Sequence, residues 1–245
     1  MIAFPKKQLF IIGFLAFFFS GCASTLRTAP SFDSTIKTVK TIAVMPPDVK
    51  VFKITAGGVT EQIDEWSDQS KKLIEAALKK HLGERYGFEI KFVSEDWLKT
   101  NHKDVWTANR ALYEAVCLSA LLHAYSDINT FPAKLKNFDY TLGEEVQELS
   151  SIVQTDALLF VYGFDYEATA CRAALWWWNL SLAVLTGSSL LPTNPSMMIV
   201  GLVDGKAGDV VWFKTSNPSV EYSFRSEKHI DMLMEWLLKD LVKKK

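Results

Sequence analysis

The order of apolar segments along the 245 residues predicts an α/β (α+β) fold, in which helices pack on a single mixed β-sheet. Three observations support this prediction. A short apolar run at 41–45 stops at two prolines, helical patterns fill most of 67–153, and 157–215 is rich in extended apolar segments with a hairpin signal. Because strands and helices are interspersed along the chain, we expect one sheet covered by helices.

The first predicted elements are two strands and a helix. Thr41–Met45 is apolar and is followed by Pro46-Pro47, which predicts a buried strand with a firm stop, because proline lacks the N–H that a sheet needs. Val49–Ile54 predicts a second extended segment. We expect a helix to start at an N-cap on Ser67, since a serine oxygen accepts from the free amides there. Its apolar face consists of Leu73, Ala77, Leu78 and Leu82.

The middle of the chain predicts a strand followed by three helices. Phe88–Val93 alternates as a strand does, and Ser94 is placed to cap a short helix. A helical pattern over 104–125 has a wide apolar arc, so we expect that helix to be mostly buried. Thr141 and Glu144 have the spacing of a capping box for the next helix.

The last part of the chain is predicted to be β-rich. Ala157–Tyr166 reads as a strand, and Ser196–Asp204 and Asp209–Thr215 flank the turn signal Gly205–Gly208, which predicts a hairpin. Ser226 is then placed to cap a final amphipathic helix.

Composition limits the classes of function. Apolar residues make up 49% of the sequence and aromatic residues 13%, which is ample for a packed core. The formal net charge is −1, without the basic excess of nucleic-acid-binding proteins, so we expect no nucleic acid partner.

Residues 1–21 have the layout of a secretory signal peptide. Lys6 and Lys7 form the positive start, Leu9–Phe19 the uncharged apolar middle, and Ser20-Gly21 the small residues before a cleavage site. An apolar run of about eleven residues is too short to span a bilayer, which needs roughly 20. The mature chain, from Cys22, then has the size of one domain, predicted as a single α/β periplasmic domain at 41–245.

The end of this leader, Phe19-Ser20-Gly21-Cys22, resembles the bacterial lipobox, with Phe19 in place of the usual leucine. The resemblance implies a lipoprotein: the Cys22 sulfur receives a diacylglycerol, the signal peptide is cleaved between Gly21 and Cys22, and the new amine is acylated with a fatty acid such as palmitate. Three acyl chains would hold the protein at a membrane, since each buried methylene contributes about 0.8 kcal/mol.

The residue after the cysteine is Ala23, which by resemblance to enterobacterial lipoproteins implies a lipid anchor in the outer membrane, on its periplasmic face. The rule differs between bacteria, so the inner membrane stays an alternative. The segment 22–40 is rich in Ser, Thr and Pro and predicts a flexible tether between lipid and domain.

Three segments resemble the curli-secretion lipoprotein family, whose α/β arrangement is shared by the N-terminal domain of the TolB translocation protein. They are Thr41–Pro47, Thr155–Gly163 ("Asp-Ala, apolar strand, Gly") and the hairpin Val203–Trp212. The resemblance implies a TolB N-terminal-like α/β fold and a periplasmic domain that associates with itself or with other envelope proteins. The two long hairpins that form a barrel in the curli channel have no counterpart here, so no pore of that kind is implied.

An apolar insertion at about 172–195 interrupts the β-rich part, and no charged residue occurs from Ala173 to Val203. It contains Trp176, Trp177 and Trp178, followed by Leu180 and Leu182, and its periodicity suits a strand and a helix equally. Tryptophan favours the boundary between lipid and water. These residues therefore indicate a membrane or partner contact, with an ordinary core hairpin and a true membrane span as the alternatives.

The residues with chemical potential are scattered. His81, His102, His123 and His229 have no metal-ligand spacing, and Asp204 and Asp209 fit turn chemistry better than a calcium loop. Glu61, Asp64, Glu65 and Asp68 fit a solvated face, and Gly57-Gly58 lacks the rest of a phosphate loop. We therefore expect no catalytic residue, metal or cofactor. Cys117 and Cys171 can pair in an oxidising periplasm, or Cys117 can be a small core residue.

Three functional hypotheses follow. The first is a non-enzymatic, lipid-anchored envelope protein that acts by forming homo-oligomers or by binding envelope proteins, in transport, secretion or envelope maintenance. The second is a small-ligand or peptidoglycan-binding module with a cleft near Pro46-Pro47 and Gly57-Gly58. The third is an enzyme of unrecognised type.

Overall fold

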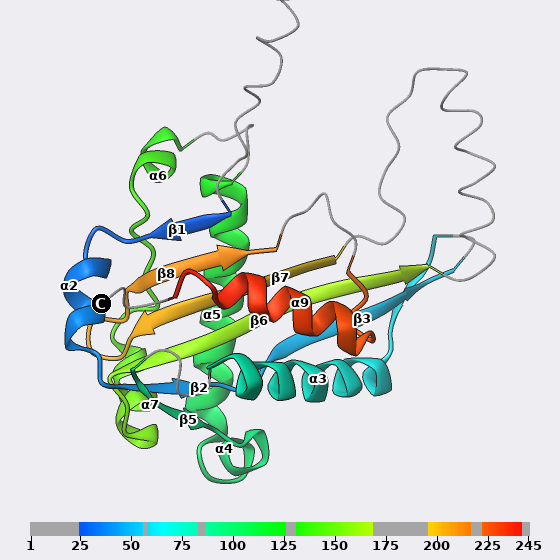
Figure 1. Cartoon of the computed structure of the whole chain (residues 1–245), viewed down its shortest axis with the longest axis horizontal. Coiled ribbons are helices and arrows are strands. Elements are labelled where there is room, and N and C mark those ends of the chain that lie inside the picture. The colour runs from blue at the N-terminus through cyan, green and yellow to red at the C-terminus, as the bar shows by residue number, and fades with distance from the viewer. Residues whose placement is uncertain are drawn as a thin grey trace, which may run out of the picture.

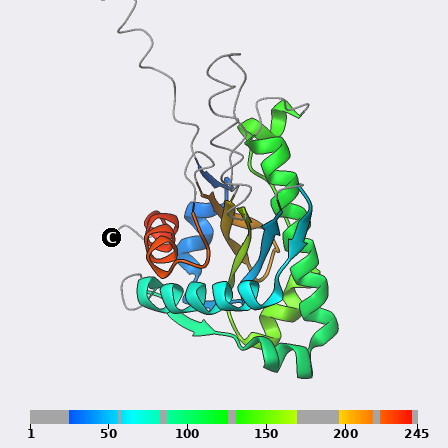
Figure 2. The same ribbon diagram turned by 90° about the vertical axis from the view of Figure 1, so that its right-hand side faces the viewer.

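One mixed β-sheet separates two layers of helices (Figures 1 and 2), which confirms the predicted α/β architecture. The structure is a computed structural model that describes residues 25–55, 58–82, 87–125, 131–168, 196–216 and 222–241. None of the helices in these ranges combines the length and hydropathy needed to cross a bilayer.

The sheet has eight strands within the described residues. Neighbouring strands follow the order β1-β8-β7-β6-β2-β5, and β3 lies beside β6 beyond the end of β2, with β4 on its outer side. β6 runs parallel to β2 and β3 and antiparallel to β7. The strands are β1 (Leu26–Thr28), β2 (Thr41–Val44), β3 (Asp48–Ile54), β4 (Thr60–Gln62), β5 (Glu89–Phe92), β6 (Ala157–Ala168), β7 (Ser196–Asp204) and β8 (Val210–Thr215).

The predicted stop at Pro46-Pro47 is confirmed, and it divides one edge of β6 between two strands. β2 pairs with Ala157–Leu159, and Met45 N–H donates to Leu159 O at 2.9 Å. The two prolines have no N–H to continue this ladder. The chain then pairs again as β3, along Tyr162–Ala168 of the same strand.

Both faces of the sheet are covered. One layer packs on the core that contains Leu159, and the other packs on the core that contains Leu158, because successive side chains of a strand point to opposite faces. The first layer consists of α2 (Phe32–Thr38), α3 (Asp64–Leu82) and α9 (Glu227–Leu238). The second consists of α4 (Glu95–Asn101), α5 (Lys103–Ala124), α6 (Pro132–Lys136) and α7 (Glu145–Val153).

The predicted helix caps have mixed outcomes. Ser94 and Ser226 cap α4 and α9 as expected, each accepting from the amide three residues on. The cap at Ser67 is wrong, because α3 begins at Asp64 and the buried Ser67 hydroxyl accepts from Val51 N–H at 3.0 Å instead. The capping box is also wrong, because Thr141 Oγ1 accepts from Gly143 N–H at 3.0 Å, and α7 starts at Glu145 without a side-chain cap.

The prediction of a flexible tether over 22–40 is wrong for the part that the structure describes. Leu26–Thr28 forms β1, which pairs antiparallel with β8, and Ala29 N–H donates to Val211 O at 3.0 Å. Phe32–Thr38 then forms α2, whose Ile36 is 6% exposed. Ordering occurs because this segment, although rich in serine and threonine, contributes a strand to an open sheet edge and apolar side chains to the core.

The expectation that the helix at 104–125 is mostly buried is wrong for one of its faces. Trp106, Tyr113 and Cys117 of α5 are buried, but Leu118 is 48% exposed and Leu122 is 59% exposed. Cys117 is a free thiol whose pKa is raised well above its ordinary value by burial. It is therefore a small core residue, and Cys171 lies outside the described residues.

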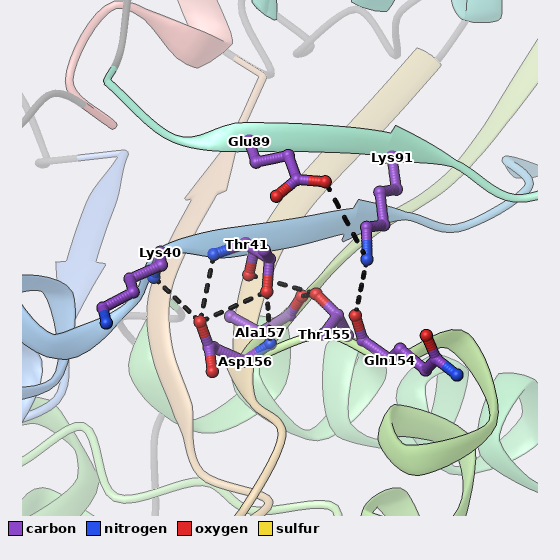
Figure 3. Close-up of polar contacts among 8 residues, drawn as sticks. All are labelled: Lys40, Thr41, Glu89, Lys91, Gln154, Thr155, Asp156 and Ala157. Carbon is purple, nitrogen blue, oxygen red and sulfur yellow. Dashed lines mark hydrogen bonds and ion pairs between the residues drawn. The ribbon is translucent and has the colours of Figure 1, made fainter.

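A carboxylate joins the starts of β2 and β6 (Figure 3). Asp156 Oδ2 accepts from the N–H groups of Lys40 and Thr41 at 2.9 and 3.0 Å and from Thr41 Oγ1 at 3.2 Å. Asp156 N–H donates in return to Thr41 Oγ1 at 3.0 Å. Nearby, Lys91 Nζ of β5 donates to Gln154 O at 2.9 Å. These contacts fix the register of the parallel strands, and the bond from Lys40 N–H is the largest cause that lowers the pKa of Asp156 below 3.8.

We predict that Asp156→Ala lowers the free energy of unfolding by about 1–2 kcal/mol at neutral pH, because three donors lose a charged acceptor. Asp156→Asn, which keeps an acceptor oxygen, costs less. Because the folded pKa is below the ordinary value, this stabilisation is present above about pH 4 and is lost as the pH falls through the folded pKa. Urea denaturation at neutral pH and at about pH 3 tests this. An Asp156→Ala deficit that is equally large in acid would contradict it.

Candidate functional site

The strand register gathers several chain positions at one end of the sheet. Thr25 O, just before β1, accepts from Thr215 N–H at 3.0 Å, and Thr215 ends β8. β7 begins at Ser196, which pairs with Asp165 of β6, and the last residue of β6, Ala168, pairs with Ile54, the last of β3. In Figure 1 the ends of β6 and β3 lie on the right, and the start of β1 and the end of β8 lie nearer the middle of the view. We call this end of the sheet, formed by Thr25, Ile54, Ala168, Ser196 and Ser216, the Thr25 edge.

The predicted lipidation residue Cys22 and the cleavage residue Gly21 lie outside the described residues, but Thr25 limits where Cys22 can be. Thr25 O is held by Thr215 N–H and by Tyr125 OH, at 3.0 and 3.2 Å. Three residues reach at most about 10 Å, since an extended chain spans no more than 3.3–3.6 Å per residue. The chain from Thr25 to Cys22 is therefore at most about 10 Å long.

The predicted contact residues Trp176, Trp177, Trp178, Leu180 and Leu182 also lie outside the described residues. Both points where their segment joins the fold are described, however. It leaves from Ala168 and returns at Ser196, and both belong to the Thr25 edge. Both junctions therefore lie toward the same end of the sheet as Thr25, but Ser196 and Ala168 are three and six residues further along the strands than Tyr162, which is level with Thr25.

Polar side chains near the end of β6 bond this strand to the segment before α9. Asp165 is 0% exposed, its Oδ2 accepts from Phe224 N–H at 2.8 Å, and burial raises its pKa to about 7. Two residues on, Glu167 accepts from Ser223 Oγ at 2.7 Å and from Arg225 Nη1 at 2.9 Å. These bonds tie the segment before α9 to the end of β6.

A second feature is a cavity of about 430 Å³ beyond the carboxyl ends of β2 and β5. Its walls are Met45-Pro46-Pro47 after β2, Phe92–Asp96 at the end of β5, and the side of α3. From β2 the chain passes through β3 and β4 to α3 on one face of the sheet, and from β5 it passes to α4 and α5 on the other. Open α/β sheets bind ligands at such switch points, so the cavity is the best-placed ligand pocket among the described residues.

The walls of this pocket carry charges of both signs. Lys71 Nζ lies 3.7 Å from Asp68 and 4.0 Å from Glu95, so it links α3 to the start of α4 across the pocket. Lys79 Nζ lies 5.5 Å from the centroid of the Phe92 ring. Lys72 forms no ion pair within the described ranges. A polar ligand with both an anionic and a cationic group matches these walls better than an apolar one.

The cleft was predicted near Pro46-Pro47 and Gly57-Gly58, and only the first half of that prediction is confirmed. Gly58, with φ of +81°, lies in the turn between β3 and β4 and does not line the pocket. The seven residues of β3 separate it from the prolines. Sequence reasoning missed Lys71, Lys79 and Glu95 as pocket residues. The signal for the two lysines was a row of lysines on one side of the helix that is α3. Only the packing of α3 against β2 and β5 shows that these residues line the same pocket.

Each of the four histidines has a separate structural position. His81 Nε2 lies 2.8 Å from Asp231 Oδ1, His102 lies against Trp97, His123 lies edge-on to Phe131, and His229 Nδ1 accepts from Ser223 N–H. No group of three or more His, Cys, Asp or Glu side chains within the described residues converges as metal ligands do.

Two further predictions from the polar residues are confirmed. Asp204 serves the hairpin turn, accepting from Lys206 N–H at 2.8 Å. The acidic residues Glu61, Asp64, Glu65 and Asp68 are exposed, as expected of a solvated face.

Comparisons with known proteins give distant matches. No family model and no curated protein matches the sequence, so the resemblance to the curli-secretion lipoprotein family stays a prediction. Among solved structures, the PelC dodecamer from Paraburkholderia phytofirmans aligns over 90% of this chain and 96% of that chain, with 8% identity and a TM-score of 0.36. The LpoB C-terminal domain from Salmonella enterica aligns over 76% and 91%, with 10% identity and a TM-score of 0.28. At these scores, neither match assigns a partner, an assembly or a function to this chain.

We predict that the protein loses stability as the pH rises through neutrality because of Asp165. Its folded pKa, about 7, is above the ordinary 3.8, so the protonated form stabilises the fold fully in acid and this contribution is lost as the pH rises through 7. The loss between about pH 5 and 8 should be about 1–3 kcal/mol.

The matched variant for this prediction is Asp165→Asn, which has nearly the same shape but does not titrate. Urea denaturation across this pH range should show a smaller decline for the variant than for the wild type. Identical slopes for the two proteins would show that Asp165 does not titrate in this range.

Proposed function

We propose that this chain is a lipid-anchored, non-enzymatic protein on the periplasmic face of the bacterial outer membrane, where it acts by binding to copies of itself or to envelope proteins. The Phe19-Ser20-Gly21-Cys22 pattern supports acylation at Cys22. The observation that carries the proposal is that Thr25, only three residues after Cys22, already belongs to the fold, because its carbonyl accepts from Thr215 N–H and Tyr125 OH. Acyl chains at Cys22 would therefore hold the domain directly at the lipid surface, without a long spacer.

A role in binding is supported by the use that the fold makes of its ionisable groups. Within the described ranges, the histidines contact single partners, and Asp156, Asp165 and Glu167 join strands to neighbouring segments. Because these groups already form bonds that hold the fold together, they support a role in binding rather than in catalysis. The uncharged segment at about 172–195 is the proposed contact region, with Trp176, Trp177, Trp178, Leu180 and Leu182 directed to membrane or partner.

The pocket at the ends of β2 and β5 favours a second candidate function, the binding of a small ligand such as a peptidoglycan fragment. Stem peptides carry both carboxylates and amines, which match the mixed charges of Lys71, Lys72, Asp68 and Glu95. This role is compatible with a lipid anchor, because the pocket does not involve the Thr25 edge.

For the anchor, we predict that the wild-type chain isolated from cells begins at Cys22 and has the mass of a triacylated protein. Cys22→Ser should abolish acylation and remove the protein from the outer-membrane fraction, because no acyl chain is attached. Mass spectrometry and membrane fractionation measure both. Cys171→Ser, which removes another thiol, should leave both unchanged. A wild-type protein with a free thiol at Cys22 would refute the anchor.

Chemical crosslinking of intact cells tests the partner-binding half of the proposal. Crosslinked species heavier than the monomer, containing a second copy or another envelope protein, are expected. A correctly acylated protein that is recovered only as a monomer would refute partner binding while leaving the anchor in place.

For the pocket, we predict that soluble muropeptides bind to the wild-type protein and that Lys72→Glu weakens this binding at least about tenfold, because it replaces a cation in the wall by an anion. Isothermal titration calorimetry measures the affinity. Lys103→Glu, which changes an exposed lysine outside the pocket, is the control with the same net charge. Equal weakening by both variants, or no binding by the wild type, would refute this ligand class.

A further inference from the structure

Three exposed apolar side chains gather at the C-terminal end of α5. Leu118 and Leu122, one helical turn apart, are 48% and 59% exposed, and Phe131 is 54% exposed. The ring of Phe131 lies edge-on to that of His123, with 4.6 Å between their centroids, so Phe131 belongs to the same part of the surface. We call Leu118, Leu122 and Phe131 the α5 patch.

The exposed face of α5 that leads to this patch is uncharged. Ala111 and Ala115 precede Leu118 and Leu122 along it, and all four are exposed. The two charged side chains in the middle of the helix pair with β3: Arg110 Nε lies 3.9 Å from Asp48, and Glu114 accepts from Lys50 Nζ at 3.0 Å. The exposed Lys103 and Asp104 lie at the N-terminal end of α5, away from the patch. A helix face that meets water is normally polar, so this face is suited to an apolar surrounding.

The α5 patch lies beside the start of β1. Tyr125 OH donates to Thr25 O at 3.2 Å, and Arg27 Nη2 donates to Ala124 O at 2.9 Å, so the end of α5 is bonded to the first described residues of the chain. Leu122 is about one turn, or 5 Å, before Tyr125 along the helix, and Leu118 is one turn further. The covalent reach from Thr25 to Cys22 is about 10 Å. An acylated Cys22 therefore brings lipid to within reach of the patch.

From this arrangement we infer that the α5 patch is a lipid-contact surface, and that the domain rests on the membrane with Leu118, Leu122 and Phe131 against it. The inference depends on the acylation of Cys22 that we propose above. It adds a second attachment, provided by the fold itself, to the covalent anchor. Two attachments a short distance apart fix the tilt of the domain, which one flexible anchor does not.

Charge and size favour lipid over a second copy as the occupant. Among the described residues, two cations lie beside the patch. Arg27 Nη2 donates to Ala124 O at 2.9 Å, and Lys134, whose N–H donates to Phe131 O at 3.0 Å, pairs with Asp139 at 2.5 Å. Anionic phospholipid headgroups attract such groups. A stable dimer buries about 1,200–2,000 Å² in total, more than two leucines and a phenylalanine supply. A lipid surface needs no such area, because the acyl chains at Cys22 already hold the protein there.

The described structure contains its own controls. Phe92, Trp97 and Met232 are 40%, 41% and 47% exposed, and thus resemble the patch residues in exposure. Phe92 belongs to β5, five strands from β1 in the sheet order, and Trp97 lies on the adjoining helix α4. Figure 1 shows β5 and α4 at the bottom, with β1 at the top. Met232 lies on α9, in the other helical layer.

Hydroxyl-radical footprinting of the full-length, acylated protein tests the inference. The wild-type lipoprotein is reconstituted into vesicles of phosphatidylethanolamine and phosphatidylglycerol, and side-chain oxidation is compared with that of the Cys22→Ser protein in buffer. We expect oxidation of Leu118, Leu122 and Phe131 to fall several-fold in the vesicle sample, while that of Phe92, Trp97 and Met232 stays unchanged. No variant at the patch is required, so misfolding does not confuse the result.

The other outcomes overturn the inference in distinguishable ways. Equal oxidation of the patch in both samples means that the patch faces water. Protection that appears in the Cys22→Ser protein without vesicles, and grows with protein concentration, identifies a second copy as the occupant. Uniform protection of patch and control residues shows nonspecific adsorption. The intact mass of the same sample reports whether Cys22 is acylated, so failure of the anchor is separated from failure of the patch.

Discussion

The twelve-residue strand β6 is the constraint on which the other elements depend. It pairs with β7 along one edge and with β2 and then β3 along the other. From Ala157 to Tyr162 every residue is buried, so both faces of the strand need a helical layer. Asp156, at its start, sets the register of β2, and Asp165, near its end, holds the segment before α9. One strand thus positions both cores and both ends of the sheet.

The pairing of β6 with its neighbours also determines where Thr25, Ala168 and Ser196 lie in the sheet. β7 and β8 follow β6 in antiparallel order, and β1 adds to β8, so the start of β1 must lie at the end of the sheet where β6 stops. The junctions Ala168 and Ser196 therefore lie toward the same end of the sheet as Thr25, six and three residues further along the strands. The pocket depends on the other side of β6, where Pro46-Pro47 interrupts the pairing beyond β2 and leaves space between α3 and the end of β5.

The elements that sequence reasoning predicted correctly are those whose signal is local. The apolar runs at Thr41–Val44 and Ala157–Ala168 and the caps at Ser94 and Ser226 depend on neighbours within a few residues. Sequence reasoning failed where the conformation of a residue depends on a partner far away in the chain. Ser67 accepts from Val51 in another strand, and Leu26–Thr28 becomes ordered only because β8 offers an open edge. The pocket combines both kinds of signal. Its prolines were predicted from the local sequence, whereas Lys71 and Glu95 come together only through tertiary packing.

An ordered β1 changes what an anchor at Cys22 does to the domain. With a spacer of 18 residues, lipid and domain would move independently, and the orientation of the domain would be left to chance. With about three residues, any pull on the proposed acyl chains would be transmitted to the β1–β8 pairing and to the bonds between Thr25, Arg27 and the end of α5. The side of the molecule with β5 and α4 then lies on the order of 24 Å from β1, at about 4.8 Å per strand. With acylation of Cys22 as proposed, lipid would be brought to the side where β1 begins, and the pocket on the far side would stay open to ligands or partners.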